Sequence, residues 1–206
     1  KNIRIETIAK TTEGRDVPLL VIANPLPKSP ADLVNDKRIV VYIQANIHAG
    51  EVEGKEGSMM LARDLVNGKI SFPANVAVAI IPVYNIGGCL NRNSHSRVNQ
   101  NGPVEYGFRG NSQNLDLNRD FTKCDSREAR SFASIFQLLK PDIFIDNHVS
   151  DGADYQHTMT LITTQYNKLG GNLGQWLKKT FEPALYKSMT DKGWDMVPYV
   201  DFEATD

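Results

Sequence analysis

Three continuous apolar runs alternate with segments of helical spacing, and this alternation is the feature that most limits the possible folds. The runs are RIVVYIQAN (38–46), NVAVAIIPVYN (75–85) and DIFIDNHVS (142–150). Each run is consistent with a strand that is buried on both faces. The segments between them, at 51–69 and 126–140, have the spacing of amphipathic helices. This order predicts an α/β fold with three layers, in which helices cover both faces of a mixed, mostly parallel central sheet.

Additional elements flank this central pattern. Residues 3–22 have the pattern of two strands joined by a turn at Glu13–Arg15, which predicts an N-terminal hairpin. HTMTLITTQ (157–165) predicts a fourth strand. Residues 171–193 predict a long helix, and Pro183 inside it predicts a kink or a break, because proline has no backbone N–H to donate.

Length and composition fit one globular domain. The chain has 206 residues, of which 41% are apolar and 23% are charged. A net charge of −1 gives no field that favours nucleic acid or an anionic membrane. The chain has no apolar run of about 18 residues, so no membrane span is expected, and two cysteines do not make a disulfide framework. Because the chain begins at Lys1 and YVDFEATD (199–206) closes no helix or strand pattern, we expect a single domain over 1–206 that is processed or trimmed at its N-terminus and incomplete at its C-terminus.

A histidine and a glutamate follow the first apolar run, and another histidine follows the third. His48 and Glu51 are three positions apart, and His148 is remote from them in the sequence. Because the carboxyl ends of such strands meet at one edge of the sheet, all three side chains are expected at the same place. Two imidazoles and a carboxylate are a suitable ligand set for a catalytic zinc ion. The alternative is structural, with His48 capping a strand and Glu51 beginning a helix, where the dipole favours a glutamate. We assign no metal role to His95 or His157.

A second polar group lies in FRGNSQNLDLNRDF (108–121), at the end of a long polar stretch that begins at residue 86. A loop of this length inside a domain is usually functional or disordered. Arg109 and Arg119 carry guanidinium groups, which bind a carboxylate or stabilise an oxyanion. The alternative is a solvated loop with two exposed arginines.

Two aspartates are placed to support the predicted ligands. Asp116 can accept the second ring N–H of a ligand histidine, which would fix its tautomer. Asp146, two residues before His148, either does the same for that histidine or caps its strand.

HAGE (48–51), NLDLNRDF (114–121) and the strand ending in DNH (146–148) together resemble the zinc carboxypeptidases of the M14 metallopeptidase family. The resemblance runs from about residue 38 to about residue 165. It implies a mixed eight-stranded sheet and a zinc ion that is held by two histidines and one glutamate. In this sequence those ligands are His48, Glu51 and His148.

The same resemblance implies roles for the second polar group. Asn118 and Arg119 would bind the terminal carboxylate of the substrate, and Asp116 would support a zinc-bound histidine. Arg109 would polarise the scissile carbonyl, with Arg97 as the rival for that role.

The sequence departs from the family pattern in three places. Of the family's Asn-Pro-Asp-Gly turn, YNIGG keeps only Asn85 and a glycine, and NRDF replaces NRNF. The general-base glutamate and a closing tyrosine of the family lie well downstream of the last zinc histidine. After His148 this chain has only Glu182, which falls in the predicted helix, and Glu203, which has no matching context. We therefore expect both residues beyond Asp206, and expect this chain alone to bind zinc with little or no turnover.

These features predict a Zn²⁺-dependent metallocarboxypeptidase that hydrolyses the C-terminal bond of peptides with a free C-terminal carboxylate. The resemblance also implies a secreted or periplasmic protein. One alternative is an amidohydrolase of N-acyl amino acids, similar to succinylglutamate desuccinylase and aspartoacylase, whose GxHGxE pattern has more glycine than NIHAGE. Another alternative is a non-catalytic module that binds zinc or peptides, although the retained ligands disfavour it.

Overall fold

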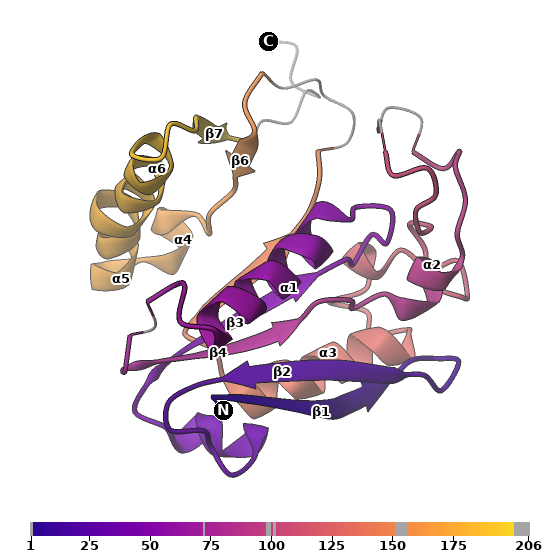
Figure 1. Ribbon diagram of the computed structural model, residues 1–206, viewed down its shortest axis with the longest axis horizontal. Helices are drawn as coiled ribbons and strands as arrows, with labels where there is room; N and C mark the ends of the chain where they lie inside the picture. Colours follow the sequence, from indigo (N-terminus) through magenta and orange to yellow (C-terminus); the bar gives the residue numbers. More distant parts are fainter. Residues whose placement is uncertain (1, 72, 98–99, 101, 151–155, 200–206) are drawn as a thin grey trace. The chain divides into compact units, whose positions relative to one another are not determined.

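A five-stranded mixed sheet organises the first of two units, Lys1–Gly152 (Figure 1). The computed structural model describes residues 2–71, 73–97, 100, 102–150 and 156–199. The spatial strand order is β1-β2-β4-β3-β5. β1 and β2, and likewise β2 and β4, are antiparallel, whereas β3 is parallel to both β4 and β5, so the predicted mixed sheet is confirmed. The strands are β1 (Ile3–Lys10), β2 (Asp16–Ile22), β3 (Ile39–Ala45), β4 (Val76–Ile81) and β5 (Ile143–Asn147).

The N-terminal hairpin forms as predicted. Its turn is closed by two backbone hydrogen bonds, in which Thr11 N–H donates to the carbonyl of Arg15 and Gly14 N–H donates to that of Thr11, each at 2.9 Å. Gly14 has φ +79°, a left-handed conformation that glycine adopts without steric cost. The hairpin thereby places β1 at one edge of the sheet.

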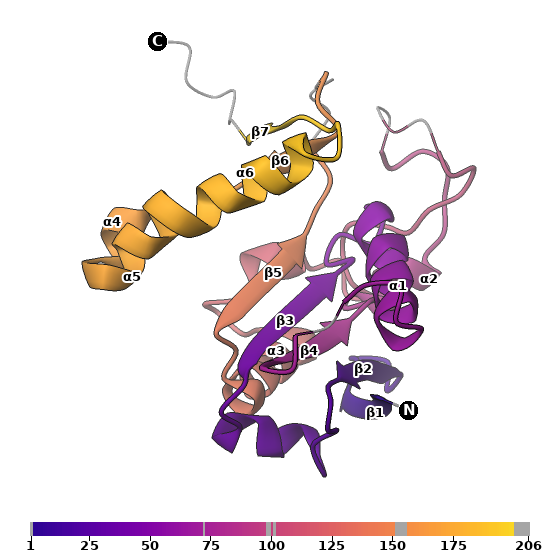
Figure 2. The same cartoon turned by 60° about the vertical axis from the view of Figure 1, so that its left-hand side comes forward.

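Helices cover both faces of the sheet, which confirms the three-layer architecture (Figures 1 and 2). Alternate residues of a strand point to opposite faces, so Tyr42 belongs to one apolar cluster and Ile43 to the other. On the Ile43 side the cluster contains Ala62 of α1, and on the Tyr42 side it contains Ile135 and Leu139 of α3. The helices of this unit are α1 (Glu53–Val66), α2 (Ile86–Leu90) and α3 (Arg127–Leu139), with 3₁₀ turns at Pro30–Asn35 and Leu117–Arg119.

A glycine brings the first turn of α1 against the end of β5. A Cβ atom built on Gly54 would lie 2.4 Å from the Cβ of Asn147 and 3.4 Å from that of Ala45. No larger side chain fits between this helix and these strand ends. The chain that leads from β3 into α1 is therefore held close to the chain that leaves β5.

Asp120 explains the replacement of NRNF by NRDF in structural terms. Its buried carboxylate accepts hydrogen bonds from the N–H of Asp125 and from both the N–H and the hydroxyl of Ser126, at 2.8, 2.8 and 2.6 Å. The hydroxyl of Ser126 in turn caps α3 by accepting from the N–H of Ala129 at 3.0 Å. Asp120 thus fixes the start of α3.

The third apolar run forms β5, but the prediction that it is buried on both faces is wrong. Among the described residues β5 pairs only with β3, and Ile145 is 40% exposed. A run of apolar residues does not distinguish a central strand from one at an edge, because both present apolar side chains to the helices.

The second unit, Ala153–Asp206, contains a short parallel pair of strands and a helical run. The predicted fourth strand is confirmed as three residues, which pair with a strand near residue 197. The helical run predicted at 171–193 continues through Pro183 without a break, and a π-helical turn lies just before the proline. The elements are β6 (Met159–Leu161), α4 (Tyr166–Leu169), α5 (Gly171–Trp176), a π-helix (Leu177–Phe181), α6 (Glu182–Thr190) and β7 (Met196–Pro198). In the part of the chain that the structure describes, no helix has both the length and the apolar character needed to cross a membrane.

Candidate metal centre

The side chains of His48, Glu51 and His148 meet beyond the carboxyl ends of β3 and β5. Each offers one nitrogen or oxygen atom, and these atoms lie within 4.8 Å of one another. His48 and Glu51 are buried, at 3% and 2% exposure, while His148 is more accessible. The sequence therefore predicted correctly which side chains come together here.

Both histidines present the same ring nitrogen to the glutamate. Nδ1 of His48 lies 2.9 Å from Oε1 of Glu51, and Nδ1 of His148 lies 3.2 Å from Oε2. On the far side of each ring, Nε2 of His48 lies 3.1 Å from Oδ1 of Asp116, and Nε2 of His148 lies 3.1 Å from Oδ2 of Asp146. A carboxylate behind a histidine fixes its tautomer and its orientation, and leaves the other nitrogen for a metal ion.

Asn46 shapes the turn that carries His48 and Glu51. It has φ +64°, and its buried Nδ2 donates to the carbonyls of Ala49 at 3.2 Å and Glu51 at 3.0 Å. Asparagine tolerates the left-handed region better than most residues. Sequence reasoning missed this residue, although an asparagine directly after a buried strand is a possible signal for such a turn.

Asn85 connects this turn to the segment that carries Arg109. It is fully buried, and its Nδ2 donates to the carbonyls of Ile47 at 3.0 Å and Arg109 at 3.1 Å. Its Oδ1 accepts from the N–H of Gly88 at 2.9 Å at the start of α2. The asparagine retained in YNIGG thus holds the residue before His48 and the backbone of Arg109 together.

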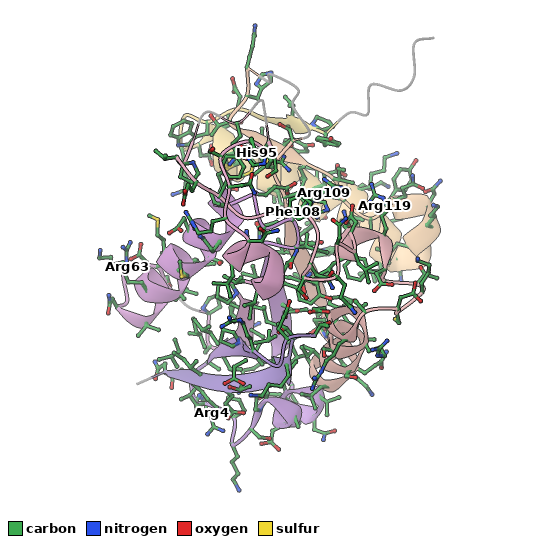
Figure 3. All side chains as sticks on the ribbon, turned by 90° about the vertical axis from the view of Figure 1, so that its right-hand side faces the viewer. Arg4, Arg63, His95, Phe108, Arg109 and Arg119 are labelled. Carbon is green, nitrogen blue, oxygen red and sulfur yellow. The ribbon has the colours of Figure 1, made fainter. Side chains whose placement is uncertain are left out.

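Arg109 and Asp116 form an ion pair behind His48. Nε of Arg109 donates to Oδ2 of Asp116 at 2.9 Å, so one carboxylate contacts both the arginine and the histidine. Burial raises the pKa of Asp116, but the hydrogen bond from Arg109 and the charge of His48 hold it below its usual range. Asn118 and Arg119 follow in a 3₁₀ turn, where Arg119 is exposed. Figure 3 shows Arg109 and Arg119 towards the same end of the first unit, away from Arg4.

Arg97 reaches the ligand cluster directly. Its Nη1 donates to Oε1 of Glu51 at 3.0 Å and its Nη2 to the carbonyl of Ser150 at 3.4 Å. The hydroxyl of Tyr106 anchors the backbone of Arg97, because it accepts from the N–H of Arg97 and donates to the carbonyl of Arg97, each at 3.1 Å. The position of Gly50 has no room for a side chain, because a Cβ would lie 2.7 Å from Cδ of Arg97. The polar stretch therefore folds over the HAGE turn. The sequence did not predict this contact, because the stretch has no helix or strand periodicity.

The hydrogen bonds of Glu51 keep it ionised. Burial alone would raise its pKa, but hydrogen bonds from His148, from His48 and from the backbone N–H of Val149 hold the pKa far below its usual range. Burial lowers the pKa of His148, but hydrogen bonds with Asp146 and with Glu51 outweigh it and raise this pKa to about 9. Two imidazoles and one ionised carboxylate, all turned to one point, are the donor set of a catalytic zinc site. The residues present therefore fit a zinc ion.

A profile of the zinc carboxypeptidase family, peptidase M14, matches residues 1–142. The chain belongs to the zinc carboxypeptidase family. The matched region includes His48 and Glu51 as well as Arg109 and the Asn118–Arg119 pair, while His148 lies just beyond it. No curated protein matches the chain significantly.

Solved structures of other proteins share the fold. A metallo-carboxypeptidase from Burkholderia cenocepacia matches with a TM-score of 0.69 and 18% identity, over 100% of this chain and 50% of that one. Carboxypeptidase A from Helicoverpa armigera matches with a TM-score of 0.60 and 14% identity, over 95% and 52%. Bovine thrombin-activatable fibrinolysis inhibitor, in complex with tick carboxypeptidase inhibitor, matches with a TM-score of 0.61 and 12% identity, over 96% and 70%. The chain spans about half the length of the first two structures, and at these identities the likeness shows the fold alone.

The group of converging ligand atoms does not include His95, His157 or Glu182. His95 is exposed in the polar stretch of the first unit. His157 and Glu182 belong to the second unit. Glu203 lies outside the described residues.

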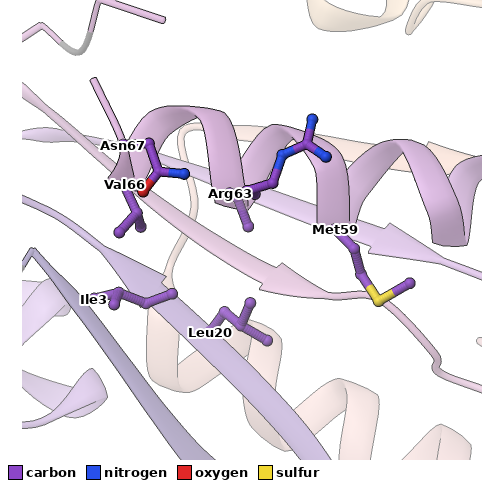
Figure 4. A pocket seen from close by; sticks show the side chains of 7 residues that line it. Ile3, Leu20, Met59, Arg63, Val66 and Asn67 are labelled. Atoms are coloured by element: carbon purple, nitrogen blue, oxygen red, sulfur yellow. The ribbon is translucent and has the colours of Figure 1, made fainter. Parts of the chain in front are cut away.

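Two surface hollows of this zinc carboxypeptidase family member lie away from the ligand cluster. One, of about 290 Å³, lies between α1 and the N-terminal hairpin and is lined by Leu20, Met59 and Val66 among others (Figure 4). The other, of about 640 Å³, lies between β1 and α3. Neither is lined by His48, Glu51 or His148.

Proposed function

We propose that His48, Glu51 and His148 bind a zinc ion, and that the protein hydrolyses the C-terminal peptide bond of peptides. The observation that carries this proposal is the convergence of the three ligand atoms within 4.8 Å, with each histidine backed by a carboxylate. A zinc ion in such a site polarises a carbonyl group and lowers the pKa of water. Family membership supports the reaction class, because the family is that of the zinc carboxypeptidases.

The protein's own residues supply binding and orientation. Asp116 accepts from Nε2 of His48 and so leaves Nδ1 for the metal. We assign Asn118 and Arg119 to the C-terminal carboxylate of the substrate, because an exposed guanidinium next to an amide suits a planar anion. We assign no general base to a residue of this chain.

Arg109 is our candidate for stabilising the oxyanion, a role worth roughly 3–4 kcal/mol in comparable sites. Its backbone is fixed by Asn85 and its side chain by Asp116. Arg97 is the rival, because it contacts Glu51 itself. In the full-length enzyme we expect Arg109→Gln to lower kcat by about 10²- to 10³-fold with little change in KM. A loss of that size in Arg97→Gln, with Arg109→Gln nearly unaffected, would transfer the role to Arg97.

The substrate class is tested with matched compounds. The zinc-loaded full-length protein should cleave peptides with a free C-terminal carboxylate, and should leave peptides with a C-terminal amide and N-acyl amino acids intact. Cleavage of N-acyl amino acids in preference to peptides would instead establish the amidohydrolase alternative. Binding of zinc and peptide without cleavage of either would establish the binding module.

We also propose that the protein acts outside the cytosol, as its resemblance to the family implies. Fractionation of the source cells tests this, since the protein should be recovered from the medium or the periplasm. Recovery in the cytosolic fraction alone would refute it.

A further inference from the structure

We propose that Asp146 is a positioning residue that holds His148 with its Nδ1 turned to the metal. This inference rests on the proposed zinc site. It assigns to the third ligand the support that Asp116 gives to the first, so that both histidines act as carboxylate-backed ligands. The role follows from the geometry of β5 and from the surroundings of the carboxylate.

The strand itself brings the two side chains together. Asp146 lies two residues before His148, and alternate residues of a strand point to the same side. Oδ2 of Asp146 consequently lies 3.1 Å from Nε2 of His148, the same distance as that between Asp116 and Nε2 of His48. His148 thus receives its carboxylate partner from its own strand, whereas the carboxylate partner of His48 comes from a remote segment.

Asp146 lies among buried and half-buried side chains of β3 and β5. It is paired in register with Gln44 on β3, next to Tyr42 and Phe144, whose rings stack at 5.1 Å. Its side chain is only 18% exposed, and its Oδ1 has no hydrogen-bond partner among the described residues. Burying an ionised carboxylate costs free energy unless the charge is paired or hydrogen-bonded. His148 is the hydrogen-bond partner that this carboxylate has in the described part of the chain.

The chemistry of the pair determines which ring nitrogen is left for a metal. A neutral imidazole has one N–H donor and one acceptor nitrogen, and an ionised carboxylate only accepts. With a metal ion in the cluster the ring would be neutral, its one proton would stay on Nε2, facing Asp146 at 3.1 Å, and the lone pair of Nδ1, on the side of Glu51, would be left for the metal. An asparagine at position 146 could donate its amide N–H to Nε2 instead, which would stabilise the opposite tautomer.

A competing explanation is that the charge protects an edge strand. β5 lies at the edge of the described sheet, and inward-pointing charges on edge strands discourage pairing with other chains. That explanation predicts that Asp146→Asn promotes aggregation but leaves metal affinity unchanged. The two explanations therefore differ in a measurable quantity.

The test compares zinc affinity, measured by chelator competition, in the wild-type protein, Asp146→Asn and Asp142→Asn. Asp142 is the matched control, because its carboxylate accepts from the N–H of Val40 at 2.8 Å at the other end of β5. We expect Asp146→Asn to bind zinc about 10- to 100-fold more weakly and Asp142→Asn to bind it as the wild type does. Equal affinity in the wild type and Asp146→Asn would overturn the inference while leaving the proposed zinc site intact. Absence of zinc binding by the wild type would instead refute the proposed function itself.

A spectroscopic measurement on the wild type does not depend on whether the variant folds. The chain has four histidines, so long-range ¹H–¹⁵N correlation spectra of the zinc-loaded protein are simple to assign. We expect the His148 ring to carry its proton on Nε2. A proton on Nδ1, or a freely exchanging mixture of tautomers, would refute the positioning role.

Discussion

The imidazole rings of His48 and His148 meet edge to face with their centroids 5.1 Å apart, although one follows β3 and the other follows β5. The two strands are parallel neighbours, so their ends lie at the same edge of the sheet. Any change that moves α1 or β5 relative to β3 should therefore disturb both stability and the ligand geometry.

Two glycines in α1 should respond in opposite ways to the same substitution. Gly57→Ala should raise the free energy of unfolding by about 0.5–1 kcal/mol, because the new Cβ meets nothing within 4 Å and alanine is the better helix former. Gly54→Ala should lower it by roughly 1–3 kcal/mol, because its Cβ would lie 2.4 Å from that of Asn147. Urea unfolding of both variants measures the difference. Equal stability of the two would contradict the close packing of α1 on the strand ends.

Asn85→Ala should destabilise the protein. The substitution leaves the carbonyls of Ile47 and Arg109 without their hydrogen-bond donor. It also leaves the N–H of Gly88 without its acceptor. Each buried polar group left unsatisfied costs about 1–3 kcal/mol, so a loss of about 3 kcal/mol or more is expected for the three groups. Asn91→Ala, at an exposed position, serves as the control and should change stability little. If both variants unfold at the same urea concentration, Asn85 does not connect the two segments.

Zinc affinity should rise with pH. The pKa of His148 is lowered by burial, but it is raised to about 9 by the hydrogen bonds with Asp146 and Glu51. Zinc binds the neutral imidazole, so below about pH 9 binding must release this proton, and affinity should increase about tenfold per pH unit between pH 7 and 8.5. Chelator competition at several pH values measures the slope. An affinity that stays constant over this range would show that His148 is already neutral or is not a ligand.

Arg119→Gln should weaken binding of peptides with a free C-terminal carboxylate. In the zinc-loaded protein we expect a loss of about 10- to 100-fold in affinity, since hydrogen bonds between charged groups are worth roughly 1.5–3 kcal/mol. Affinity for the matching peptide amide should stay unchanged, because the amide has no anion to bind. Arg63→Gln is the control, since this exposed arginine of α1 pairs with Asp64. If Arg119→Gln weakens both ligands equally, the carboxylate is bound elsewhere.

Much of the fold could be predicted because the apolar runs are long and continuous. The strands β3, β4 and β5 and the helices α1 and α3 lie where the pattern places them. The spatial order of the strands could not be predicted, since no local sequence pattern shows that β4 lies between β2 and β3. The edge position of β5 was missed for the same reason, because a strand's neighbours are set by the whole sheet.

The ligand cluster could be predicted because strand ends meet by topology. His48, Glu51 and His148 needed only the alternation of strands and helices to be brought together. Arg97 on Glu51 and Asn46 in the turn could not be found this way. Their positions depend on how segments without helix or strand periodicity fold around the turn that carries His48 and Glu51. The composition of such segments does not determine their conformation.

The most direct test of the central claim is the zinc content of the purified protein and of three variants after dialysis against limiting metal. The wild type should hold one zinc ion per chain, and His48→Ala and His148→Ala should each lose nearly all of it, because a site with two protein ligands holds zinc weakly. His95→Ala, which removes an exposed imidazole from the polar stretch, should keep the wild-type content. Wild-type zinc content in His148→Ala would contradict the metal centre on which the account depends.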